Sequence, residues 1–120
     1  MTGTESTLVL TRRSHPAGPI LLRLDGELDH HTVPRFNREL ADLPLSPDTA
    51  VILDLSGLEY CDSTGLTALV GAHHRAGTAG CRMGLVGLRP HVERVFVVTG
   101  LDRFLALHPT TERALDHLRQ

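Results

Sequence analysis

Lysine is absent from this 120-residue chain, and cysteine occurs only twice. Without lysine, the chain cannot carry the glycine-rich phosphate-binding loop whose lysine contacts a bound nucleotide. Cys61 and Cys81 do not form a CxxC pair, and two cysteines do not suggest the disulfide framework of a small secreted domain. We therefore expect both cysteines to be free thiols.

The chain also lacks an excess of charge and any long apolar run. Its 12 basic residues face 14 acidic ones, without a basic stripe or a like-charge tail, so nucleic acid and membranes are not expected as partners. No apolar run approaches the roughly 20 residues that span a bilayer. The N-terminal sequence MTGTESTLVL lacks the basic flank and apolar stretch of a signal peptide. These absences predict a cytoplasmic protein.

Length and composition indicate one domain. A chain of 120 residues with 41% hydrophobic residues can bury one core of useful size. Residues 1–6 are polar and are expected to form a flexible N-terminus, and residues 7–120 are expected to form the single domain.

Short apolar runs alternate along the chain with segments of helical periodicity. Strands are predicted at residues 8–10, 20–24, 51–55, 83–86 and 104–107. Helices are predicted at residues 33–43, 63–76 and 90–99, with a fourth after Thr110 or Thr111. Thr32 is expected to cap the first helix, while Pro90 and Gly100 suit the beginning and end of the third.

This order of elements predicts an α/β fold. The sheet should be mixed, with four to five strands, parallel inner strands and an antiparallel N-terminal edge strand, and about four helices should flank it. Loops at the carboxyl ends of parallel strands share one edge of a sheet, where sites are usually built. The loops expected at this edge are residues 26–31, 56–63 and 87–91. Ser63 should lie in the middle, with Asp29 and Asp62 as acidic neighbours.

The sequence Asp62-Ser63-Thr64-Gly65 opens the second predicted helix and places a hydroxyl group at its N-terminus. Free N–H groups and the positive end of the helix dipole would accept a phosphate there. The simplest alternative is that these residues only cap the helix, which contributes about 1 kcal/mol. Gly65 would then serve close packing and Asp29 a turn.

Three segments together resemble a known family. Gly26 to Thr32 reads GELDHHT, Leu53 to Ser56 reads LDLS, and Asp62 to Leu66 reads DSTGL. These motifs, at spacings consistent with one domain, are similar to those of the anti-sigma factor antagonists, the bacterial STAS domains. The resemblance covers residues from about 20 to 118 in the family's order of elements.

The resemblance implies a regulatory function. The unphosphorylated protein would bind an anti-sigma factor that is also a serine kinase, and so release the sigma factor that it held. Phosphorylation of Ser63, or secondarily Thr64, would abolish binding until a serine phosphatase reverses it. The implied partner-binding residues are Asp29, His30, Asp62, Ser63, Thr64, Gly65 and Leu66.

Two other functions are open to a chain with these motifs. An enzyme with Ser63 as nucleophile is disfavoured, because DSTG is not the GxSxG elbow and no histidine has a spacing that makes it the general base. A STAS-like module could instead bind a nucleotide or another regulatory protein without being phosphorylated. We expect no enzymatic activity and no cofactor.

The histidines and Cys61 suggest further sites that the sequence does not favour. The pairs His30-His31 and His73-His74 lack the spacing of a zinc site, so no metal is expected. Cys61 stands before the DSTG motif, where an apolar residue is common in the family. A packing role is therefore favoured over redox sensing for this thiol.

Overall fold

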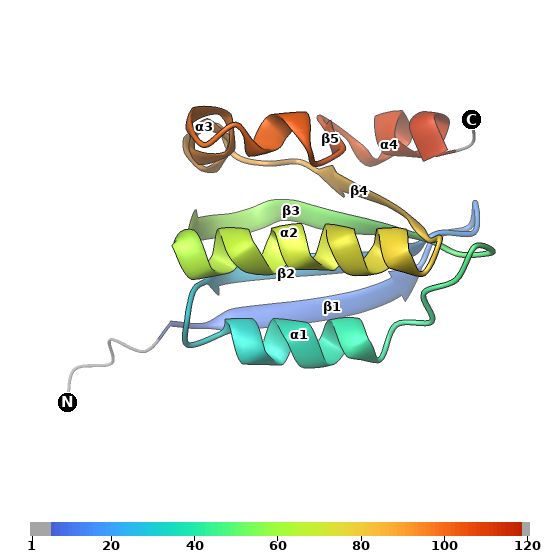
Figure 1. Cartoon of the computed structure of the whole chain (residues 1–120), viewed down its shortest axis with the longest axis horizontal. Helices are drawn as coiled ribbons and strands as arrows, with labels where there is room; N and C mark the ends of the chain where they lie inside the picture. Colours follow the sequence, from blue (N-terminus) through green and yellow to red (C-terminus); the bar gives the residue numbers. More distant parts are fainter. Residues whose placement is uncertain (1–5, 119–120) are drawn as a thin grey trace.

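The computed structural model describes residues 6–118 as a five-stranded mixed sheet with helices on both faces (Figure 1). The strands are β1 (Leu8–Ser14), β2 (Ile20–Leu28), β3 (Ala50–Cys61), β4 (Arg82–Val86) and β5 (Leu107–His108). Their order in the sheet is β1-β2-β3-β4-β5; β1 pairs antiparallel with β2, and the other pairs are parallel. The predicted fold class is confirmed.

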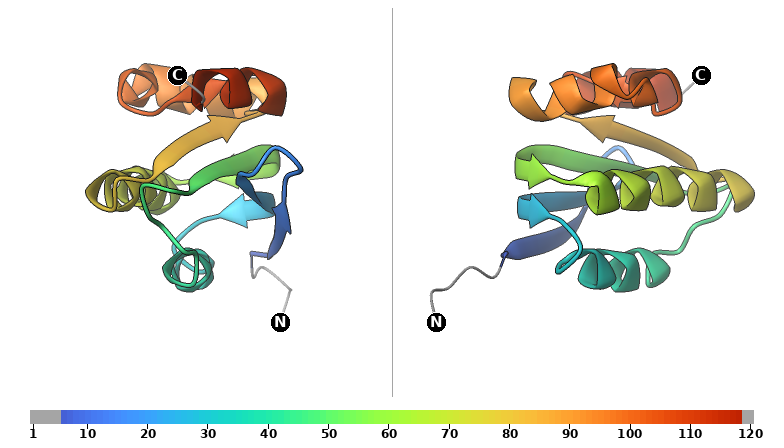
Figure 2. Two further views of the ribbon diagram at one scale, coloured as in Figure 1. Left: turned by 90° about the vertical axis from the view of Figure 1, so that its right-hand side faces the viewer. Right: turned by 60° about the vertical axis from the view of Figure 1, so that its left-hand side comes forward.

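Four α-helices and one short 3-10 helix connect and cover the strands. They are α1 (Val33–Ala41), α2 (Ser63–Thr78), α3 (Pro90–Val98), η1 (Leu101–Arg103) and α4 (Thr111–Leu118). In Figure 2, α1 and α2 lie side by side along one face of the sheet. The last turn of α1 ends before Pro44, as predicted, and α3 begins at Pro90 and is followed by Gly100 at φ +77°.

The alternation of side chains along β3 divides the core between the two faces. Val51, Leu53 and Leu55 point into the main cluster, with the buried residues of α1, α2 and α3. Ala50 and Ile52 point the other way, into a smaller cluster with the inner residues of α4. Because both faces are covered, this strand is apolar almost continuously, as is typical of a central parallel strand.

The two strands that lead to the predicted site are longer than predicted. β2 reaches Leu28 instead of residue 24, and β3 reaches Cys61 instead of residue 55, so residues 56–61 of the predicted loop 56–63 are strand. Two register shifts in the β2–β3 pairing, after Arg23 and after Gly26, let the pairing continue through this polar and glycine-containing segment.

The last predicted strand was placed wrongly. Residues 104–107 read as an apolar run, yet β5 covers only Leu107–His108, and the Phe104 side chain is 72% exposed. The chain leaves α3 through η1, which turns Phe104 outward and leaves Leu105 as the buried residue of this segment. A short apolar run does not by itself distinguish a strand from the turn of a 3-10 helix.

The predicted flexible N-terminus, residues 1–6, lies outside the described residues except for Ser6, whose hydroxyl donates a hydrogen bond to Asp29. Residues 119–120 also lie outside them. Between residues 6 and 118, the structure contains no helix with the length and apolar character needed to cross a membrane.

His108 of β5 is a half-buried titratable residue that packs beside α4. The centroid of its ring is 5.1 Å from that of His117, and its Nε2 is buried with no hydrogen-bond partner among residues 6–118. Burial, together with the neighbouring His117, lowers the pKa of His108 below its ordinary value of 6.5.

This environment predicts that acid weakens the fold. As the pH falls through about 6.5, the unfolded chain binds a proton at His108 more readily than the folded chain does, so the free energy of unfolding should fall. His108→Phe removes that difference, and we expect its loss of stability between about pH 7.5 and about pH 5.5 to be smaller than that of the wild type. Urea unfolding at both pH values measures this, and equal losses in the two proteins would contradict it.

Candidate functional site

The carboxyl ends of β2 and β3 lie at one end of the molecule, where the predicted site residues follow them (Figure 1). β3 ends at Cys61 and α2 begins at Ser63, so only Asp62 separates the strand from the helix. The Asp62 backbone N–H donates to the carbonyl oxygen of Leu28, at the end of β2, over 3.3 Å. The first turn of α2 is thus attached to both strands.

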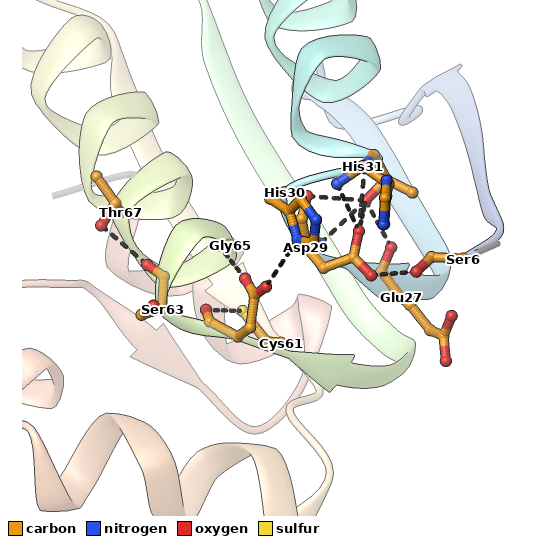
Figure 3. Close-up of polar contacts among 11 residues, drawn as sticks. Ser6, Glu27, Asp29, His30, His31, Cys61, Ser63, Gly65 and Thr67 are labelled. Atoms are coloured by element: carbon orange, nitrogen blue, oxygen red, sulfur yellow. Dashed lines mark hydrogen bonds and ion pairs between the residues drawn. The ribbon is translucent and has the colours of Figure 1, made fainter. Parts of the chain in front are cut away.

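Asp62, and not Ser63, caps α2. Its backbone is extended, and its Oδ1 accepts a hydrogen bond of 2.8 Å from the Gly65 N–H (Figure 3). Its Oδ2 lies 3.8 Å from Nδ1 of the exposed His30. Ser63 therefore occupies the first position inside the helix, with an exposed side chain that has no capping function. The capping interpretation of the motif applies to the aspartate alone.

Gly65 brings α2 close to β2. A Cβ atom at this position would lie 2.2 Å from the Leu28 carbonyl oxygen and 2.8 Å from the Cys61 Sγ. Since the first of these is a backbone atom in a central strand, it cannot move aside cheaply. This contact, with the Asp62 cap, fixes the position of Ser63.

Cys61 is a buried free thiol beneath this turn. Burial and, to a smaller extent, the charge of Asp62 raise the pKa of Cys61 to about 12. The thiol is therefore protonated at neutral pH, and packing is its role, as the sequence favoured.

Asp29 holds the start of α1 and does not face Ser63. Its side chain is buried, and it accepts hydrogen bonds from the Ser6 hydroxyl and from the backbone N–H groups of His31 (2.9 Å) and Thr32 (3.2 Å) (Figure 3). Burial acts to raise the pKa of Asp29, but the hydrogen bonds from Ser6, His31 and Thr32 outweigh it and lower the pKa below 3.8.

Thr32 precedes α1 as predicted, but its side chain does not cap the helix. Its hydroxyl donates to the Glu27 carbonyl oxygen over 2.8 Å and accepts from the Asp29 N–H over 3.0 Å. Residues 29–32 of the GELDHHT segment, which follow β2, therefore form a turn whose polar groups bond to one another and to the Glu27 carbonyl oxygen, and Asp29 serves this turn.

The other predicted site residues divide by exposure. His30, Ser63 and Thr64 are exposed, whereas Gly65 and Leu66 are buried beneath them. Asp62 is half-buried and adds negative charge beside Ser63. Within residues 6–118, no three side chains of histidine, cysteine, aspartate or glutamate come close enough together to hold a metal ion.

Comparison with known proteins agrees with this geometry. A family model for the STAS domain matches residues 10–114. The chain belongs to the STAS domain family. It is 31% identical over 101 residues to an anti-sigma F factor antagonist of Lysinibacillus sphaericus, covering 83% of this chain and 86% of that one. It is 28% identical over 105 residues to the anti-sigma F factor antagonist of Paenibacillus polymyxa, covering 87% and 90%.

A solved structure shows the same likeness over nearly the whole length of both chains. An anti-sigma factor antagonist from Mycobacterium paratuberculosis superposes on this STAS domain with a TM-score of 0.83 at 28% identity, covering 95% of this chain and 96% of that chain. The resemblance inferred from the three motifs is thereby confirmed.

The sequence analysis did not identify one exposed apolar part of the surface near Ser63. Val97, Val98 and Phe104 are large apolar side chains that the STAS domain exposes around the end of α3. The sequence did contain a sign of this surface. Val97 and Val98 lie outside the buried stripe of α3, at positions where a helix that packs on a sheet with one face carries polar residues on the other.

The close approach at Gly65 makes a measurable difference between two glycines of α2. Gly65→Ala should lower the free energy of unfolding by about 1–3 kcal/mol, because the added methyl group meets the Leu28 carbonyl oxygen. Gly71→Ala is the control: no atom lies within 4 Å of the new Cβ, and the variant should gain up to about 1 kcal/mol. Denaturant unfolding compares them, and a Gly65→Ala protein as stable as the wild type would refute the contact.

Proposed function

We propose that this STAS domain is an anti-sigma factor antagonist switched by phosphorylation of Ser63. Its unphosphorylated form binds an anti-sigma factor that is a serine kinase and so releases the sigma factor. The observation that carries this proposal is the exposed Ser63 hydroxyl at the first position of a firmly attached helix, within the DSTG motif. The similarity to anti-sigma factor antagonists supports the choice of partner.

The domain itself can tolerate the phosphate. In the transfer, a bond forms between Ser63 Oγ and the γ-phosphorus of ATP, the bond to the bridging oxygen breaks, ADP leaves, and the hydroxyl proton passes to solvent. The product carries about −1.5 to −2 charges at neutral pH. It lies at the N-terminus of a 16-residue helix, where the dipole and free N–H groups stabilise negative charge, and Ser63 points into solvent. The fold should therefore persist.

A complex that covers Ser63 cannot tolerate the phosphate equally well. The partner would have to remove water from a dianion that already lies beside the Asp62 carboxylate. Burying such a charge without a counter-charge costs several kcal/mol, and each loss of about 1.4 kcal/mol weakens binding tenfold. A loss of hundreds-fold in affinity then needs no conformational change.

The remaining predicted residues have distinct roles in this proposal. His30 contacts the partner directly, because its side chain is exposed beside Asp62, and the exposed Thr64 lies at the edge of the contact. Asp62, Gly65 and Leu66 hold the turn that presents Ser63, and Asp29 holds the turn that presents His30. A serine phosphatase restores the binding form, and the domain itself performs no catalysis.

The phosphate acceptor can be tested directly by mass. Each serine-kinase anti-sigma factor of the source organism is purified and incubated with this protein and ATP, and the intact mass is measured. One phosphate is expected on the wild type and on Thr64→Ala, and none on Ser63→Ala. A phosphate on Ser63→Ala that is lost in Thr64→Ala would transfer the assignment to Thr64. Absence of modification by every such kinase would contradict the proposal.

The same kinases test the binding half of the switch. Immobilised wild type and Ser63→Ala should both retain the kinase that modifies Ser63. Ser63→Asp should retain less of it, because a carboxylate brings one of the charges of the phosphate. Retention by Ser63→Asp equal to that by Ser63→Ala would count against a charge-based switch.

A further inference from the structure

Two surface grooves follow opposite sides of α2, and the adjacent hydroxyl residues of the DSTG motif open into different ones. Ser63 lines a groove of about 290 Å³ between α2 and the segment that follows α3, which we call the Ser63 groove. Thr64 lines a groove of about 500 Å³ between α2 and α1. Consecutive residues of a helix point about 100° apart, so the two hydroxyl groups face different grooves.

The Ser63 groove is suited to an apolar occupant. Its lining residues are Ser63, Leu66, Thr67, Val70, Thr99 and Leu101. None of them is ionisable. The threonine hydroxyl groups already donate hydrogen bonds within the chain, that of Thr67 to the Ser63 carbonyl oxygen (2.9 Å) and that of Thr99 to the Val95 carbonyl oxygen (2.7 Å). A charged group entering this groove would lose water without gaining a counter-charge.

The segment that forms one wall of this groove carries an unusual amount of exposed apolar surface. Val97 (55% exposed), Val98 (78%) and Phe104 (72%) flank the lining residues Thr99 and Leu101 in the sequence. In the described part of the chain, the other large hydrophobic side chains with high exposure are Val9 and Tyr60. Several exposed apolar side chains on one segment suit a surface that contacts another protein.

We infer that the Ser63 groove receives an apolar side chain of the serine-kinase anti-sigma factor, and that this contact aligns Ser63 for phosphorylation. The inference rests on the proposed function. Ser63 identifies the occupant, because the protein that phosphorylates this hydroxyl group must cover the groove into which it opens. The size of the groove, at the lower limit for a small-molecule pocket, suits a side chain better than a cofactor.

The groove between α1 and α2 has different chemistry. Asn37, His74 and Arg75 contribute polar and charged groups to its lining. Its hydroxyl residues are Thr64 and Thr67; Thr67 also lines the Ser63 groove, and its hydroxyl group is bonded to the Ser63 carbonyl oxygen. A kinase docked there would encounter Thr64 in preference to Ser63. The two grooves therefore predict different phosphate acceptors and different sensitivities to substitution.

Two adjacent positions of α2 distinguish the grooves. Val70 lines the Ser63 groove, and Gly71 lines the other, with no atom within 4 Å of the Cβ that a substitution would add. With the kinase that modifies Ser63, Val70→Lys should weaken binding and slow Ser63 phosphorylation by about tenfold or more. Gly71→Lys places the same charge one residue away and should change both by less than about twofold.

Val70 is half-buried, so Val70→Lys could weaken binding by destabilising the fold. Val98→Lys is the second variant, because Val98 is exposed and its replacement leaves the core intact. Val98→Lys should unfold at the wild-type temperature and also weaken binding.

The inference is overturned if Gly71→Lys is the damaging change, or if Val70→Lys and Val98→Lys both bind as the wild type does. It is also overturned if the groove mediates a concentration-dependent dimer that Val98→Lys abolishes in sedimentation. In each case Ser63 phosphorylation by the kinase would still stand, whereas absence of that modification would remove the proposed function itself.

Discussion

The first turn of α2 rests on the carbonyl oxygen of Leu28, and this contact determines where the Ser63 hydroxyl lies. Only glycine at position 65 permits it, since a Cβ atom would come within 2.2 Å of that oxygen. The Asp62 N–H bonds to the same carbonyl group, while its carboxylate caps the helix. The helix that presents Ser63 is thereby held to two central strands, and the hydroxyl group is left free at the surface.

The sequence sufficed for the fold class, because apolar periodicity and the ends of α2 and α3 agree with the tertiary structure. The sequence did not predict the features that depend on contacts between residues far apart in the chain. β3 continues through Ser56–Cys61 because β2 lies beside it, although this segment reads as a loop. Phe104 is exposed because η1 turns it outward, although its neighbours read as a strand.

The sequence placed the DSTG motif at the start of α2, but it did not show how the residues of the candidate site are arranged around it. Asp29 and Asp62 read alike as acidic neighbours of Ser63. The structure separates them: the Asp29 carboxylate is buried against Ser6 and the start of α1, and the Asp62 carboxylate caps α2 beside Ser63. The Ser63 groove was not recognised, because it joins residues of α2 with residues more than 25 positions later.

A firmly held helix and a surface hydroxyl beside an apolar groove together suit a switch that acts by charge at an interface. The most direct measurement is calorimetric titration of the serine-kinase anti-sigma factor with unmodified and with stoichiometrically phosphorylated protein, alongside thermal unfolding of both forms. The account predicts a loss of affinity of about a hundredfold or more, with little change in the unfolding temperature. Undiminished binding by the phosphorylated protein, or weaker binding accompanied by loss of the fold, would contradict it.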